Sequence, residues 1–259
     1  MIYMHENNLI RKINNNYDGK GELLNKFYQE EYKNYYEKIS KLDYASKDIN
    51  VFKEAVNLIE EYLKKIDELS RQGVKSQSKF RSSVIEEIST YLFQNHHLIT
   101  SGTFGIFNKN IFSGMKIDNH MHIDIIPKDV DFCIGKKVKV VIDDEQTKEL
   151  IIPVVCVEVK TYLDATMFGE VQYSSKQIKN ASPNAKTYVL MEYNSVAKEK
   201  IIAARYDNVL NEMFVLRADA RSPLSERVLL DYYIEIENAL KNTENVDDVV
   251  VPGKLINPS

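Results

Sequence analysis

The chain has 259 residues, enough for one large domain or for a core domain with a smaller appendage. Apolar residues make up 44% and charged residues 28%, a globular composition that can form a buried core. The formal net charge of −4 excludes a nucleic-acid binder that relies on overall positive charge. Such a protein would have to concentrate its Lys and Arg on one face.

The two cysteines, Cys133 and Cys156, lie in apolar runs and lack the spacing of a metal site, which favours a reducing cytoplasm. No run approaches the roughly 20 apolar residues that span a bilayer. Residues 1–16 lack the apolar stretch of a signal peptide. We therefore expect a cytoplasmic protein, and the abundance of Asn, Lys, Ile and Tyr indicates a bacterial source.

The first 73 residues are predicted to be helical. Residues 22–44 mix apolar and charged side chains, and residues 48–70 carry apolar side chains at the three-to-four spacing of an amphipathic helix. Gly73 is expected to end that helix. We treat residues 1–73 as an N-terminal helical region, which serves either as a plain supporting bundle or in recognition or dimerisation.

A third helix is predicted over residues 78–94. It is apolar on nearly all sides, which is typical of a buried helix. Glu86 and Glu87 nevertheless lie in its middle, an unusual place for carboxylates.

Strand patterns dominate after Thr100. The predicted strands cover 120–126, 130–134, 138–142, 150–159 and 187–191, with turns at 135–137 and 143–145. Helices are predicted over 165–180, capped by Asp164, and over 224–240. The order of elements predicts an α/β fold in which helices flank a mixed sheet.

The strand that ends in Val157-Glu158-Val159-Lys160 is the most informative stretch. Side chains alternate across a strand, so Glu158 and Lys160 should share one face while the neighbouring valines share the other. By itself, Glu-x-Lys is more often an ordinary salt bridge.

Asp131 changes that interpretation. It stands 27 residues before Glu158, in a run where Val130, Phe132 and Ile134 should face the core and Asp131 the opposite side. If the two strands form a hairpin, the two carboxylates converge. Two carboxylates and water suit a hard cation such as Mg²⁺, and a nearby lysine can orient a water that attacks a phosphate.

Asp131, the later Glu158-Val159-Lys160 and the helix that begins after Asp164 resemble the signature of the PD-(D/E)xK nuclease superfamily. The buried helix with Glu86-Glu87 resembles its first core helix. The resemblance covers residues 78–191. The stretches 79–83 and 158–167 are most similar to bacterial type II restriction endonucleases, in the branch that cuts gapped sites such as CCTNAGC.

The resemblance implies a restriction-endonuclease-like core and roles for individual residues. It assigns catalysis to Asp131, Glu158, Lys160 and Glu86, and metal binding to Asp131, Glu158 and the Val159 carbonyl, with Mg²⁺ as the cofactor and Mn²⁺ as a substitute. Pro127 stands four residues before Asp131 and two before Asp129, so Asp129 is the alternative ligand, as Glu87 is to Glu86.

Some side chains near these residues are candidates for contacts with DNA. Lys176 and Lys179 lie on the helix after the strand, and Thr161 and Thr166 lie near the N-terminus of that helix, where phosphate binds well. A solvated helix face explains the lysines equally well. The histidines in His120-Met121-His122 are better explained by a half-exposed strand than by a zinc site.

We therefore predict a type II restriction endonuclease that cuts double-stranded DNA at a short sequence. Its nuclease core would cover residues 74–200, with a C-terminal extension over 201–259. One constellation per chain predicts a homodimer or a heterodimer with a related subunit, and a cognate methyltransferase is expected. The alternatives are a repair, recombination or Mrr-like nuclease, and a non-catalytic DNA-binding protein with a degenerate core.

Overall fold

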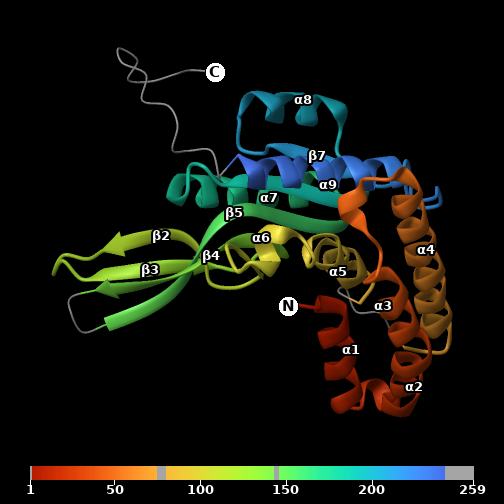
Figure 1. The fold of residues 1–259 in the computed structure, drawn as a ribbon. Helices are drawn as coiled ribbons and strands as arrows, with labels where there is room; N and C mark the ends of the chain where they lie inside the picture. Colours follow the sequence, from red (N-terminus) through yellow and green to blue (C-terminus); the bar gives the residue numbers. More distant parts are fainter. Residues whose placement is uncertain (1, 75–79, 143–145, 243–259) are drawn as a thin grey trace.

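The computed structural model describes residues 2–74, 80–142 and 146–242 (Figure 1). The helices are α1 (Met4–Asn14), α2 (Gly21–Phe27), α3 (Lys33–Ile39), α4 (Ile49–Arg71), α5 (Ser82–Phe93), α6 (His97–Thr100), α7 (Ala165–Ala181), α8 (Lys198–Tyr206) and α9 (Glu226–Lys241). The strands are β1 (Gly105–Phe107), β2 (Ile111–Ile117), β3 (Ile123–Lys128), β4 (Phe132–Ile142), β5 (Gln146–Leu163), β6 (Lys186–Asn194) and β7 (Glu212–Val215).

The N-terminal region is helical, as the sequence predicts. The helix expected over residues 22–44 consists of α2, a π-helical turn and α3. α4 begins after Asp48, whose carboxylate accepts a hydrogen bond from the Asn50 N–H and so satisfies one free donor of the first turn. Beyond its C-terminus, Gly73 takes a φ of +88°, a conformation that glycine adopts without steric cost.

The seven strands form one mixed sheet around the long strand β5. β4 pairs antiparallel with β5, from Phe132 opposite Val157 to the hairpin end. β6 pairs parallel with the C-terminal half of β5, and β7 continues that parallel part. β2 and β3 form a hairpin that joins the sheet at Ile111.

Helices cover both faces of this sheet (Figure 1). On one face, Val155, Val157 and Val159 of β5 share an apolar cluster with α5, α9 and the N-terminal helices. On the other face, the β6 residues Val189 and Met191 pack with α7 and α8. These layers confirm the predicted α/β fold with a restriction-endonuclease-like core.

The turn predicted at residues 135–137 is wrong, because β4 runs straight through it. Gly135 instead follows a register shift between β4 and β5. A Cβ at this position would lie 2.5 Å from the Ile152 carbonyl oxygen, so the glycine permits close approach of two backbones. The second predicted turn, at 143–145, lies outside the described residues.

Val130 is buried in the core as expected, but not in the same cluster as Phe132 and Ile134. Phe132 and Ile134 pack in the cluster with α5 and α9, but Val130 packs with Cys133 in the cluster that includes α7. β4 begins only at Phe132, so strand alternation does not extend back to Val130.

Buried charges connect the N-terminal helices to the sheet. Arg217, after β7, lies 3.1 Å from the Glu192 carboxylate of β6 and 3.3 Å from Glu60 of α4. Arg81 lies 3.4 Å from Glu192 and 2.8 Å from Asp67 of α4. Because Glu192 and Arg217 are almost fully buried, each depends on the other for charge compensation.

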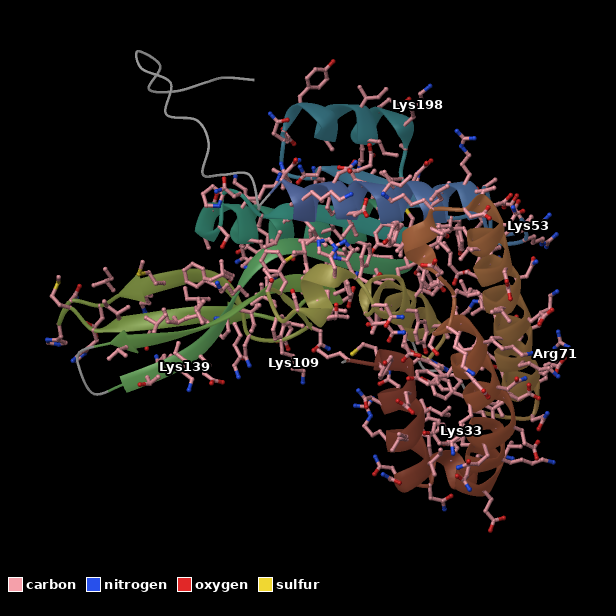
Figure 2. All side chains as sticks on the ribbon, viewed as in Figure 1. Lys33, Lys53, Arg71, Lys109, Lys139 and Lys198 are labelled. Carbon is pink, nitrogen blue, oxygen red and sulfur yellow. The ribbon has the colours of Figure 1, made fainter. Side chains whose placement is uncertain are left out.

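A projecting arm is formed by β2, β3 and the paired ends of β4 and β5 (Figure 1). Lys139 lies on this arm, Lys33 on the N-terminal helices and Lys198 on α8 (Figure 2). In the described parts of the chain, every helix is too short or too polar to cross a membrane.

Candidate active site

Asp131, Glu158 and Lys160 converge where β4 begins beside β5. The Lys160 ammonium lies 3.2 Å from Oε2 of Glu158 and 3.5 Å from Oδ2 of Asp131. The three side chains are 16%, 18% and 27% exposed in the order Asp131, Glu158 and Lys160, so the group is largely buried but still reached by water. The predicted hairpin thus brings the two carboxylates and the lysine together.

The backbone of β5 completes this arrangement. The last paired residues are Phe132 and Val157, so Val159 lies beyond the paired part of β4. Its N–H donates to Oδ2 of Asp131 at 2.8 Å. Both polar backbone groups of a strand residue point to the same side, so the Val159 carbonyl also points towards Asp131.

Charge is unbalanced at the site. Burial, and next the charge of Asp131, raise the pKa of Glu158, while Lys160 and the Ser174 hydroxyl act in the opposite direction. Burial lowers the pKa of Lys160, but the charges of Asp131 and Glu158 outweigh it and the net shift is upward. Two carboxylates therefore share one ammonium, an arrangement that favours a further cation.

The donor set fits a divalent cation with a preference for oxygen. Asp131 and Glu158 offer carboxylate oxygens, and Val159 offers a carbonyl oxygen on the same side. Residues 2–74, 80–142 and 146–242 contain no cluster of three or more His, Cys, Asp or Glu side chains arranged to hold a metal ion. Water or other ligands from outside the chain would have to complete the coordination.

The two glutamates of α5 have different surroundings. The Glu87 carboxylate accepts hydrogen bonds from the N–H groups of His5 and Glu6, at 2.8 and 3.0 Å, and from the hydroxyls of Tyr32 and Tyr91. It therefore caps the N-terminus of α1.

Glu86 is 3% exposed, on a helix whose neighbouring residues pack against the valine face of β5. Glu158 is on the opposite face, where α7 lies. The structure therefore places Glu86 across the sheet from Glu158, and its predicted role stays a prediction.

The remaining candidates surround this site without a shared contact. Asp129 is exposed, whereas Asp131 is held by Val159 and Lys160, so the geometry favours Asp131 as the ligand. Thr166 is exposed in the first turn of α7, where its N–H donates to the Asp164 cap.

Thr161 is half-buried on β5, and strand alternation places it on the same face as Val157 and Val159. Lys176 is exposed on α7, whereas the Lys179 ammonium donates to the Asn208 carbonyl at 2.9 Å. DNA contacts by these residues stay predictions. The histidine pair is exposed near the tip of the β2–β3 hairpin, where His122 bonds to Asp118.

Two residues of α7 were missed by sequence reasoning. Ser174 donates to Oε1 of Glu158 at 3.1 Å, and Gln177, one turn later, accepts from Lys128 at 3.3 Å. Ser174 and Gln177 are three apart, as neighbours on one helix face should be. This spacing was the available signal, but serine and glutamine are too common on helices for it to stand out.

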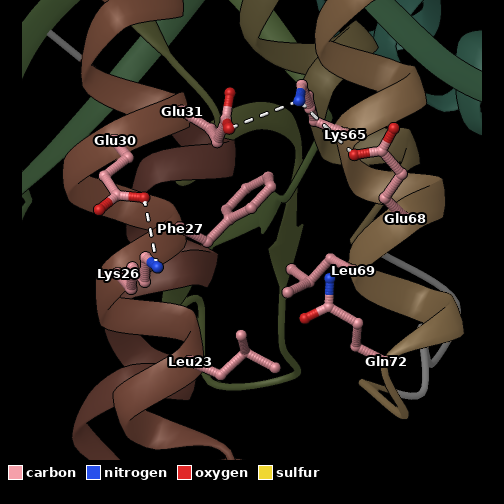
Figure 3. Close-up of a pocket in the computed structure, with 9 residues that line it drawn as sticks. All are labelled: Leu23, Lys26, Phe27, Glu30, Glu31, Lys65, Glu68, Leu69 and Gln72. Carbon is pink, nitrogen blue, oxygen red and sulfur yellow. Dashed lines mark ion pairs between the residues drawn. The ribbon is translucent and has the colours of Figure 1, made fainter.

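A cavity of about 200 Å³ lies between α2 and α4 (Figure 3). Leu23, Phe27 and Leu69 contribute its apolar lining, and ion pairs between Lys26 and Glu30 and between Lys65 and Glu31 stand at its rim. It contains none of the site residues. The candidate site is instead an open position at the edge of paired strands.

Comparison with known proteins identifies the family. The model of the Bpu10I restriction endonuclease family matches residues 77–239, more than half of the chain. The chain belongs to the Bpu10I restriction endonuclease family. The matched segment of this family member runs from α5 to α9 and includes Asp131, Glu158 and Lys160. It is a type II restriction endonuclease and thus a DNA nuclease, a class that generally uses divalent metal ions.

A solved structure supports the fold of this Bpu10I family member along nearly its whole length. The structure described as the native BbvCI A2B2 tetramer at low resolution matches with a TM-score of 0.70 and 20% identity. The match covers 93% of this chain and 96% of that one. The comparison with curated proteins finds no match.

Proposed function

We propose that this chain hydrolyses phosphodiester bonds of double-stranded DNA at a short specific sequence with Mg²⁺. The observation that carries the proposal is the convergence of Asp131, Glu158 and Lys160 at 3.2–3.5 Å beside the Val159 backbone. Asp131, Glu158 and the Val159 carbonyl would hold Mg²⁺, for which Mn²⁺ could substitute. When bound, the cation supplies charge neutralisation at the phosphate and favours deprotonation of water.

The chain's own residues set the geometry of the reaction. The Asp131 carboxylate is fixed by the Val159 N–H, and the Glu158 carboxylate by Lys160 and Ser174. The pKa of Lys160 is shifted upward, so its ammonium stays protonated at neutral pH. It therefore acts as a hydrogen-bond donor that orients the attacking water and the phosphate oxygens.

Assembly is proposed from the number of sites. The described part of the chain holds one such constellation, whereas cutting both strands requires two. BbvCI is described as an A2B2 tetramer, with subunits of two kinds. We propose that this chain likewise works with a related second subunit, and that its target is an asymmetric, gapped site of the CCTNAGC kind. The helices of residues 1–73 or α9 would contribute to recognition or dimerisation.

The proposed biological setting is a bacterial restriction-modification system in the cytoplasm, with a DNA methyltransferase that protects the same site. The test of the proposed function is digestion of a sequenced plasmid in Mg²⁺, with and without a candidate second subunit, followed by run-off sequencing. Discrete breaks at one short sequence are expected. Breaks that follow DNA structure, at junctions or ends, would instead assign the chain to repair.

A further inference from the structure

The Glu158 carboxylate is held from two different elements. Its Oε2 accepts from the Lys160 ammonium on the same strand at 3.2 Å. Its Oε1 accepts from the Ser174 hydroxyl at 3.1 Å, and Ser174 belongs to α7. Each carboxylate oxygen therefore has one donor, and the plane of the carboxylate is fixed.

The position of Ser174 follows from how α7 is attached to the sheet. Asp164 ends β5 and caps α7 through the N–H groups of Thr166 and Met167. α7 then runs back over the face of β5 that carries Glu158. Val171 and Ile178, one turn to either side of Ser174, are buried in the apolar clusters beneath the helix.

Burial leaves the Ser174 hydroxyl few other partners. The residue is 7% exposed, and a buried hydroxyl is expected to make a hydrogen bond within the protein. Glu158 is also largely enclosed, at 18% exposure. The bond thus joins two partly desolvated groups, one of which is charged, a combination that strengthens hydrogen bonds.

We infer that Ser174 is a positioning residue for the nuclease reaction, which holds the Glu158 carboxylate in the orientation that binds the divalent cation. The inference rests on the proposed function of Glu158. A glutamate side chain loses rotamer entropy when it is fixed in one orientation. Ser174 and Lys160 supply that ordering before metal and DNA arrive, because both donors are part of the folded protein.

Removal of the hydroxyl should weaken metal binding more than it slows the chemical step. Residues that orient metal ligands typically affect metal affinity or activity by about 10–100-fold. We expect Ser174→Ala to raise the Mg²⁺ concentration for half-maximal single-turnover cleavage about tenfold. The rate at saturating Mg²⁺ should change much less, because Asp131, Glu158 and Lys160 all remain.

Ser175 provides a matched control. It is the next residue of α7, is 2% exposed, and is not a hydrogen-bond partner of Glu158. Ser175→Ala makes the same chemical change at the same depth. Ser174→Thr keeps a hydroxyl and should restore most of the metal affinity, whereas Ser174→Cys keeps the volume but offers only a weak donor.

The experiment compares these variants with Glu158→Ala in the full chain, alone for metal binding and together with the proposed second subunit for cleavage. Mn²⁺ binding is measured by electron paramagnetic resonance in the absence of DNA, and cleavage is measured against Mg²⁺ concentration. Thermal unfolding identifies any variant that fails to fold. If Ser174→Ala does so, the comparison of Ser174→Cys with Ser174→Thr replaces it.

Weaker Mn²⁺ binding by Ser174→Ala or Ser174→Cys, with near-normal Ser174→Thr and Ser175→Ala, supports the inference. Unchanged metal dependence in the loss variants overturns it, as does an equal change in Ser175→Ala. If Glu158→Ala cleaves and binds Mn²⁺ normally, the proposed function itself fails. If only Glu158→Ala is defective, the site stands and the role of Ser174 is wrong.

Discussion

The Val159 N–H donates to Oδ2 of Asp131 at 2.8 Å, just beyond the last residue pair of β4 and β5. If β4 began earlier in the chain, its backbone would pair with the Val159 N–H in place of the Asp131 carboxylate. The end of the β4–β5 pairing thus fixes one carboxylate of the candidate site. Any substitution at Val159 other than proline would leave this donor in place.

Alanine substitutions at the three central residues should abolish cleavage and spare binding. Asp131→Ala and Glu158→Ala remove the proposed cation ligands, and Lys160→Ala removes the proposed donor to water and phosphate. Loss of a carboxylate also removes negative charge from the site that DNA would approach, so binding should not weaken. The measurements are cleavage in Mg²⁺ and a gel shift in Ca²⁺.

Asp129→Ala is the control for these substitutions, because Asp129 is exposed and two residues from the proposed ligand. It should cut close to the wild-type rate. Near-normal cutting by Glu158→Ala or Lys160→Ala would contradict the site. An inactive Asp129→Ala beside an active Asp131→Ala would move the ligand by two residues and leave the mechanism in place.

The stability of the protein should depend on pH through two buried neighbours with opposite effects. Burial raises the pKa of Glu87 from 4.5 to about 7, and burial lowers the pKa of His5 from 6.5 to about 3. The folded state thus favours protonated Glu87, whose contribution to stability is lost as pH rises through about 7. It favours neutral His5, whose contribution is lost as pH falls below about 6.5.

The two effects should nearly cancel between about pH 4.5 and 6.5. His5→Gln should reveal the Glu87 effect, so that its free energy of unfolding rises, relative to wild type, as pH falls through that window. Glu87→Gln should show the reverse. The difference between the two variants should reach a few kcal/mol, at ~1.4 kcal/mol per pKa unit. Urea unfolding at several pH values measures it, and parallel profiles for the two variants would rule the coupling out.

Breaking the buried ion network should be costly. Glu192→Gln removes the nearest carboxylate of the Arg217 guanidinium, whose side chain is 4% exposed, and leaves it Glu60 at 3.3 Å. Breaking a buried ion pair typically costs about 3–5 kcal/mol of stability, and because Glu60 remains, the loss should lie at the lower end of that range. Glu37→Gln, which removes an exposed pair with Lys41, is the matched comparison and should have little effect on urea unfolding. Similar midpoints for both variants would contradict the prediction.

Two glycine-to-alanine substitutions should change stability in opposite directions. In Gly135→Ala the new Cβ would lie 2.5 Å from the Ile152 carbonyl oxygen, so β4 and β5 must separate and stability should fall by about 1–3 kcal/mol. Gly169 lies inside α7 with nothing within 4 Å of an added Cβ, so Gly169→Ala should raise stability by about 0.5–1 kcal/mol. Thermal unfolding of both variants measures these changes in stability. Equal shifts of the two unfolding midpoints would contradict the prediction.

The sequence was most informative where local pattern and chemistry agree. Alternation along β5 predicted the shared face of Glu158 and Lys160, and the Asp164 cap predicted where α7 begins. It was least informative where distant contacts decide. Glycine is typical of a turn, but Gly135 lies in a strand, where it allows the Ile152 backbone to approach closely. No local signal in the sequence reveals that neighbour.

The glutamates of α5 show the same limit. Sequence reasoning noted that two carboxylates occupy a buried helix, but not that Glu87 caps α1. That contact joins residues that are 82 apart in the chain. The sequence alone does not distinguish the two adjacent glutamates, because the difference between them depends on where α1 lies. Ser174 was missed for a related reason, since its role is defined only by the Glu158 oxygen that it contacts.

The cap on α1 has a consequence for synthesis of the chain. α1 has 11 residues, a length at which an isolated helix is marginal in water. Its capping carboxylate follows 82 residues after His5, which is roughly 4–16 s later at ~5–20 residues per second on the ribosome. α1 is therefore expected to become stable only after α5 has been synthesised, although α1 precedes α5 in the chain.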